Sequence, residues 1–512
     1  MSLSVSSDCS SSSSSAALEW KFSQVFGDKV PGEDVQDIDI ISAIEFDKTG
    51  NHLAAGDRGG RVVIFEDKGG KDDMIEFTPR KELEQLDSVV SKHPKFQYKT
   101  EFQSHEPEFD YLKSIEIEEK INKVRWCATT NASSFILSAN DKTIKLWKVK
   151  DRGKKQVKEM DICESVSSEN SLLAEKSFVG GRNLANGHSL ELTKNMEYGV
   201  SSYNGIHNKI ACLEDTTLAR CQRVYAHAHE FNINSISINS DWETFLSGDD
   251  LRINLWNLEV SNQCFNIIDM KPENMDDLIE MITAAEFHPF HCNLLAYSSS
   301  RGFIRLVDMR QSALCDRAAR ILKDEKSQGP KSLFTEIIAS ITDMKFANDG
   351  RHILSRDYMN LKLWDLHMDA SPVATFRIHE NLRPKLCDLY NSDAIFDKFG
   401  CCVAGDRLTF ATGSYSNLLR VFAFGTGSEE GVTVTANKNS NRKPHVQPTT
   451  RARRSSLSNL ARGFYRQGHD NHSTTGNELS YDFNSKLLHL AWHPTASLIA
   501  CAVGNSLLMY SA

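Results

Sequence analysis

Two kinds of polar cluster in this sequence contain residue types that could support chemistry. The segment His288-Pro289-Phe290-His291-Cys292 holds metal-binding side chains, and the pairs Asp249-Asp250 and Asp276-Asp277 hold carboxylates of the kind used in general acid/base catalysis. A similar His-Pro step recurs in Trp492-His493-Pro494, which favours a structural turn at the first segment. Adjacent acids on an exposed turn do not point at a common centre. We therefore predict no catalytic residue, no metal ligand and no cofactor site.

The sequence also lacks the common motifs of nucleotide-binding and hydrolytic sites. The sequence has no GxxxxGK[ST] phosphate loop, GxGxxG fingerprint, HExxH pair or GxSxG elbow. Its 512 residues, 40% hydrophobic and 25% charged, are typical of a globular protein, and the net charge of −9 argues against general binding of nucleic acid or anionic membranes. The 12 cysteines form no CxxC pair, and no stretch approaches the roughly 18 apolar residues of a membrane span. We expect a cytoplasmic protein, with the nucleus as a second location.

The elements that position these residues come from an internal repeat. A short apolar strand, a polar turn, a second strand ending near Gly/Ser-Asp and a third strand ending in an aromatic recur seven times, with copies beginning near Ser42, Val124, Ile236, Ala285, Met344, Thr409 and Leu490. Such strands predict an all-β, seven-bladed β-propeller, with a β-sandwich as the alternative. The seventh copy ends after three strands, so we expect residues 20–26 to supply its fourth strand and to close the ring.

The length requires long insertions in this ring. From its length alone, the chain would be expected to contain about three domains, whereas a single seven-bladed ring needs only roughly 300 residues. We predict a serine-rich tail over 1–19 and one propeller over 20–512, with insertions at about 66–105, 150–223 and 425–478. Between 431 and 469 all charges are basic, so this segment is a solvated flexible loop, a nuclear-import signal or a kinase target at Arg453-Arg454-Ser455-Ser456.

Blade geometry sorts the loops into two faces. In an antiparallel blade with strands a to d, the b–c turns and the connections from strand d to the next strand a emerge together. These segments are rich in acids in several blades, including Glu33-Asp34, Glu118-Glu119 and Asp276-Asp277. An acidic surface attracts basic segments, so we predict that this face binds a Lys/Arg-rich protein segment.

Several strings are more specific than the repeat itself. They are EFDYLKSIEIEEKINK from Glu108, NINSISINSD from Asn232, DLRINLW from Asp250, ITAAEFHP from Ile282, SRDY from Ser355 and IFDKF from Ile395. Together they resemble the B/B55 (PR55) family of regulatory subunits of protein phosphatase 2A (PP2A), a WD-repeat (WD40) family, and they favour a plant-type member. The resemblance covers about 20–512.

The resemblance implies a non-catalytic member of a heterotrimer. Its partners would be the PP2A scaffold A subunit, which consists of HEAT repeats and is held by an arm between about 150 and 182, and the catalytic C subunit, which owns the metal chemistry. Phosphoprotein substrates with basic segments would bind the acidic face. The substrate-binding residues implied by the motifs are Asp37, Arg58, Phe109, Glu116, Glu118, Phe231, Asp250, Leu278, Asp357 and Lys362. Blade geometry independently places all of them except Phe109 and Lys362 on or beside the acidic face.

A second functional class is a WD40 substrate receptor of a ubiquitin ligase or another generic scaffold. Its motif would be Val307-Asp308-Met309-Arg310, which resembles a WDxR box without the aromatic first residue. Co-purified partners distinguish the two: a scaffold and phosphatase pair supports the first class, and a cullin adaptor supports the second.

Overall fold

The structure is a computed structural model that describes residues 19–27, 36–68, 93–127, 133–150, 219–315, 320–325, 332–368, 370–405, 408–425, 431–437 and 481–512. All of them belong to one compact unit, Met1–Asp151 with Leu218–Ala512. Residues 1–18, the expected arm at about 150–182 beyond residue 150, and the basic segment beyond residue 437 lie outside the described residues.

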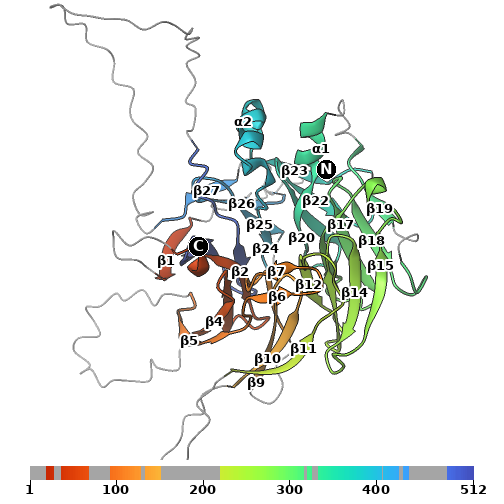
Figure 1. Ribbon diagram of the computed structural model, residues 1–512. Helices are drawn as coiled ribbons and strands as arrows, with labels where there is room; N and C mark the ends of the chain where they lie inside the picture. The colour runs from red at the N-terminus through yellow and green to blue at the C-terminus, as the bar shows by residue number, and fades with distance from the viewer. Residues whose placement is uncertain are drawn as a thin grey trace, which may run out of the picture. The chain divides into compact units, whose positions relative to one another are not determined.

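Seven four-stranded antiparallel sheets make up this unit, which confirms the predicted seven-bladed β-propeller (Figure 1). Blade 1 consists of β2 (Ile41–Phe46), β3 (His52–Asp57), β4 (Arg61–Asp67) and β5 (Phe96–Gln103). Blade 2 consists of β8 (Lys123–Trp126), β9 (Ser133–Ala139), β10 (Ile144–Lys150) and β11 (Ala219–Tyr225). Blade 3 consists of β12 (Ser235–Ile238), β13 (Thr244–Gly248), β14 (Arg252–Asn257) and β15 (Cys264–Asp269). Blade 4 consists of β16 (Ile282–Phe287), β17 (Leu294–Ser299), β18 (Ile304–Asp308) and β19 (Arg320–Leu322). Blade 5 consists of β20 (Ile341–Phe346), β21 (His352–Asp357), β22 (Asn360–Asp365) and β23 (Ala374–Arg377). Blade 6 consists of β24 (Cys401–Val403), β25 (Thr409–Gly413), β26 (Leu418–Ala423) and β27 (Val432–Thr435).

Blade 7 is closed by the amino-terminal strand, as predicted. It contains β28 (Leu490–Trp492), β29 (Leu498–Val503), β30 (Ser506–Ser511) and, on its outer edge, β1 (Lys21–Phe26). β1 pairs antiparallel with β30, and Trp20 packs edge-on against Trp492 with ring centroids 5.3 Å apart. The strand therefore covers an edge that would otherwise be left unpaired.

Short helices and one hairpin lie in the connections between blades. They are η1 (Asp37–Asp39), the hairpin β6 (Glu108–Asp110) and β7 (Ile115–Ile117), η2 (Met275–Asp277), α1 (Leu333–Ala339), η4 (Glu380–Lys385), α2 (Leu386–Asn391) and η5 (Ala394–Phe396). α1 starts at a capping box in which Ser332 and Thr335 satisfy each other's backbone amides. Each connection leads from an outer strand to the innermost strand of the next blade.

The core lies between neighbouring blades. Contacts join each innermost strand to the next around the ring, including β2 to both β8 and β28. One apolar cluster fills each junction; at the closing junction, Phe46 and Leu53 of blade 1 pack with Leu498 and Leu507 of blade 7. Successive side chains of a strand point to opposite sides of a blade, so β3 supplies Leu53 to the junction with blade 7 and Ala54 to the junction with blade 2.

Candidate functional site

Backbone hydrogen bonds bring the b–c turns and the d-to-a connections together on one face, which we call the upper face. In blade 1, Arg58 N donates to Ile40 O at 3.0 Å, and Ile121 N of the next connection donates to Asp57 O at 3.0 Å. The same link recurs from Ile282 N to Asp250 O at 2.7 Å. The grouping of these loops, expected from blade topology, is confirmed.

Three predicted residues surround one hollow on this face. Asp37, Arg58 and Glu118, with Ile38, Glu119 and Lys120, line a space of about 350 Å³. Arg58 donates to the Asp37 carboxylate at 2.6 Å, and both side chains remain well exposed. Glu118 forms no ion pair among the described residues, so its charge is available to a ligand.

The hairpin β6–β7 brings two further predicted residues together. Phe109 and Glu116 lie directly opposite each other in its register, and the Phe109 ring packs edge-on against Tyr111 at 5.0 Å. Tyr111 and Leu112 at the tip are 86% and 98% exposed, although neither was predicted. Their signal in the sequence was an adjacent aromatic and aliphatic pair, flanked by the charged residues Asp110 and Lys113.

The adjacent acids Asp249 and Asp250 have different roles. Asp249 is fully buried and accepts hydrogen bonds from His229 Nδ1 at 2.9 Å and from the amides of Leu251 and Arg252 at 2.8 and 2.7 Å. Burial by itself raises the pKa of Asp249, but these hydrogen bonds outweigh it and leave the pKa below its ordinary value. Asp250 is half-buried and has one long contact, 3.4 Å from Asn234 Nδ2.

Asp250 therefore points a weakly bonded carboxylate toward the upper face. Burial raises its pKa, and the positive charge of Lys398 partly offsets that effect. Of the two neighbours, Asp250 is the one that can still gain from a cationic partner, because Asp249 is fully buried and already accepts three hydrogen bonds.

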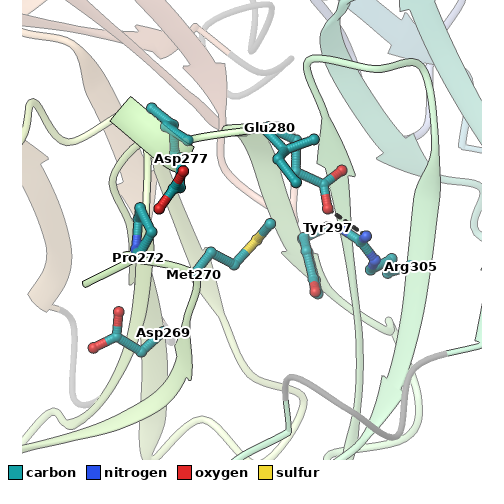
Figure 2. Close-up of a pocket in the computed structure, with 9 residues that line it drawn as sticks. Asp269, Met270, Pro272, Asp277, Glu280, Tyr297 and Arg305 are labelled. Carbon is teal, nitrogen blue, oxygen red and sulfur yellow. Dashed lines mark hydrogen bonds and ion pairs between the residues drawn. The ribbon is translucent and has the colours of Figure 1, made fainter. Parts of the chain in front are cut away.

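Leu278 lies at a second hollow, between blades 3 and 4, of about 320 Å³. Figure 2 shows this hollow, with Met270 lying between Pro272 and Tyr297, and Glu280 directed at Arg305. Leu278 follows η2, whose first turn is capped by the Asn274 side chain accepting from Asp276 N. The hollow combines an apolar floor with the carboxylates of Asp269 and Asp277.

The predicted residue Phe231 is half-buried in the connection from β11 to β12. Its neighbour Glu230 binds Lys271 at 2.6 Å and Arg252 at 3.3 Å. This connection therefore supplies an apolar ring beside an acid that already forms two ion pairs.

The structure does not bring Asp357 and Lys362 into the exposed acidic group. Asp357 is only 6% exposed, and its carboxylate accepts from the amides of Met359 and Asn360 at 2.9 and 2.6 Å. Lys362 Nζ lies 3.2 Å from Asp324 and 3.6 Å from Asp357. Burial raises the pKa of Asp357, and Lys362 works against that shift. In the conformation described, both residues shape the turn of blade 5.

The upper face carries a surplus of unpaired acids. Ion pairs engage several carboxylates, but among the described residues none engages Glu116, Glu118, Glu119, Asp250, Asp276 or Asp277. All of these except Glu119 and Asp250 are exposed. Unpaired exposed carboxylates attract cationic segments without having to break an internal contact.

The histidine segment is structural, as predicted. His288 Nε2 donates to Gly350 O at 2.7 Å, and its Nδ1 accepts from the amides of Phe290 and His291. His493 forms the corresponding bond to Gly50 O at 3.1 Å. Each ring thus joins a turn of its own blade to the next blade. Within the described part of the chain, no three His, Cys, Asp or Glu residues cluster as metal ligands, and no helix has the length and apolarity to cross a membrane.

Comparison with known proteins gives a consistent result. The chain is 57% identical over 502 residues to the alpha isoform of the serine/threonine protein phosphatase 2A 55 kDa regulatory B subunit of Oryza sativa subsp. japonica, covering 97% of this chain and 85% of the relative. It is 56% identical over 507 residues to the beta isoform of Arabidopsis thaliana, covering 99% of both chains. The protein phosphatase PP2A regulatory B subunit of Schizosaccharomyces pombe is 44% identical, covering 96% of this chain and 98% of the relative. No family model matches the chain.

Proposed function

Because this chain belongs to the family of 55 kDa regulatory B subunits of protein phosphatase 2A, we propose that its upper face selects phosphoprotein substrates that carry basic segments. The observation that supports this proposal is the group of carboxylates without ion pairs, including Glu116, Glu118 and Asp250. The chain is regulatory and not catalytic, as its relatives' names state.

Selection rests on charge and apolar contact together. Glu116 and Glu118 attract Lys and Arg side chains and raise the rate of encounter, while Phe109, opposite Glu116, offers an exposed apolar ring for contact. At the second hollow, Leu278 likewise lies near Asp277, an exposed acid that forms no ion pair among the described residues. A ligand with basic residues interspersed with apolar ones matches both places.

The protein contributes to dephosphorylation through proximity. It binds the scaffold A subunit and the catalytic C subunit, and a substrate held on the upper face is presented to the metal centre of the latter at a raised effective concentration. The phosphoryl chemistry belongs to that partner. The arm expected to hold the scaffold, at about 150–182, lies outside the described residues apart from Lys150.

The test combines charge reversal with loss of the apolar contact. The double variant Asp250→Lys with Leu278→Ala is expected to bind a basic phosphosubstrate at least about tenfold more weakly, because it repels the cation and removes apolar area. Pull-downs with the scaffold and catalytic partners should recover the same stoichiometric trimer as the wild type.

Glu243→Lys is the matched control. Glu243 is an exposed acid of the same blade as Asp250, but it lies in the a–b turn at the opposite end of the strands. It should leave both substrate binding and assembly unchanged. Loss of the trimer with substrate binding intact in the double variant would refute the proposed assignment of the face.

A further inference from the structure

The junction between blades 5 and 6 contains a buried arginine without a counterion. Arg356, near the end of β21, is 0% exposed, and none of its three guanidinium nitrogens has a hydrogen-bond partner. β21 contacts β24 of blade 6. Buried polar groups are almost always paired, so a guanidinium with every nitrogen unpaired calls for a ligand.

A second arginine reinforces the positive charge. Arg420 of β26 donates through one terminal nitrogen to Arg377 O and Ile378 O, at 3.1 and 3.0 Å, but its Nε is buried without a partner. Burial lowers the pKa of Arg356 to about 10; the negative charge of Asp357 opposes this shift, and the positive charge of Arg420 adds to it. Arg356 nevertheless remains protonated at neutral pH.

None of the described neighbouring groups forms an ion pair with this guanidinium. Asp357 is committed to the amides of its turn and to Lys362, and no carboxylate lies within ion-pair distance of Arg356 in the described residues. His379 is saturated by Tyr358 O at 2.7 Å and Ser414 Oγ at 2.8 Å. The Phe399 ring, 5.7 Å from Arg356 Cζ, provides a face but no negative charge.

We propose that a small monovalent inorganic anion, of the chloride type, binds between blades 5 and 6 on the free nitrogens of Arg356, with Arg420 Nε as a second donor. Burying an unpaired charge is strongly unfavourable, and an anion both accepts the hydrogen bonds and cancels the charge. A water molecule would satisfy only the first need. Because the guanidinium is fully enclosed, the site excludes large organic anions. The anion would fix blade 6 to blade 5 beneath the connections of the upper face.

Bromide provides the direct test, because it substitutes for chloride and scatters anomalously. Crystals of the wild-type holoenzyme grown in sodium bromide should show an anomalous peak within roughly 3.5 Å of the Arg356 guanidinium, the distance of a hydrogen-bonded ion. Density that fits water alone, or a carboxylate that pairs with Arg356, would overturn the proposal.

Thermal unfolding of the purified full chain provides the second test. At ten times its Kd, a bound anion raises the folded-to-unfolded ratio about elevenfold, so sodium chloride should raise Tm by roughly 2 to 4 °C over sodium gluconate of equal ionic strength. Arg356→Met should lose this difference, while Arg301→Met, a substitution of an exposed arginine, should keep it. Equal Tm values for the wild type in both salts would contradict the site. If Arg356→Met fails to fold, the bromide experiment still decides.

Discussion

Substitutions of the neighbours Asp249 and Asp250 should separate the contribution of this turn to folding stability from its contribution to substrate recognition. Asp249 ends a chain of hydrogen bonds that begins at Trp256 Nε1, which donates to Ser247 Oγ at 2.8 Å. The Ser247 hydroxyl lies 2.6 Å from His229 Nε2, and His229 Nδ1 lies 2.9 Å from Asp249. Because a carboxylate can only accept, His229 Nδ1 is the donor of its bond to Asp249.

The cost of Asp249→Asn follows from these bonds. The carboxylate accepts three hydrogen bonds, and each bond to a charged acceptor contributes about 1.5 to 3 kcal/mol. Asparagine keeps one acceptor oxygen but turns an NH₂ group toward the remaining donors. We expect a loss of about 2 to 4 kcal/mol, which lowers Tm by roughly 3 to 6 °C in a domain of this size. Asp250→Asn removes one 3.4 Å contact and should change Tm by less than about 2 °C.

Differential scanning fluorimetry of the two variants measures these shifts, and binding of a basic phosphopeptide measures recognition. Asp250→Asn should weaken peptide binding while keeping the wild-type Tm. The pKa of Asp249 is lowered in the fold, so its stabilisation is present above the unfolded pKa of about 3.9 and is lost as pH falls through the lower folded value. Asp249→Asn should therefore flatten the acid limb of the stability curve. Equal Tm losses for the two variants would refute the division of roles.

Three further substitutions test the ring. Trp20→Ala should cost about 3 to 5 kcal/mol in urea unfolding, because the ring is buried against Trp492; an unchanged midpoint would show that β1 does not close blade 7. Burial lowers the pKa of Lys123 to about 8, so between pH 8 and 10 only the unfolded chain keeps the proton on this side chain. The Tm of the wild type should therefore rise over this range, because the unfolded state binds more protons than the folded state. Lys123→Met should abolish the rise, and a rise that persists in this variant would contradict the assignment. Gly50→Ala should lower Tm clearly, since its φ is +79° and a Cβ would lie 2.3 Å from the His493 ring; a wild-type Tm would contradict that packing.

Much of the ring could be predicted because the inner three strands of most blades have a strong sequence signal; in blade 6 the innermost strand, β24, was not recognised. The strand b segments, such as β3 and β25, are almost wholly buried and read as apolar runs between turns. The outer strands have a weaker signal. β11 alternates half-buried and exposed residues, and β5 and β27 also carry exposed positions, so these three fell inside the stretches 66–105, 150–223 and 425–478 that the sequence assigned to insertions.

The site was predictable to the extent that topology fixes it. Glu116 and Asp250 reach the upper face because their loops must emerge there. Topology does not say which of two adjacent acids turns inward, and that choice depends on donors as distant in sequence as His229. Asp357 is buried for the same kind of reason, because the amides of its own turn satisfy the carboxylate locally. The unpaired guanidinium of Arg356 has no signature in the sequence at all.

The central claim, that this protein selects basic phosphosubstrates through unpaired carboxylates, is tested most directly by steady-state kinetics of the trimer reconstituted with its scaffold and catalytic partners. Two phosphopeptides that differ only in a basic or a neutral flanking segment would be compared for the wild type and for the double variant Glu116→Lys with Glu118→Lys. We predict a KM about tenfold higher for the basic peptide in the variant, with kcat and the neutral peptide unaffected. An unchanged KM for the basic peptide, or an equal rise for both peptides, would contradict the claim.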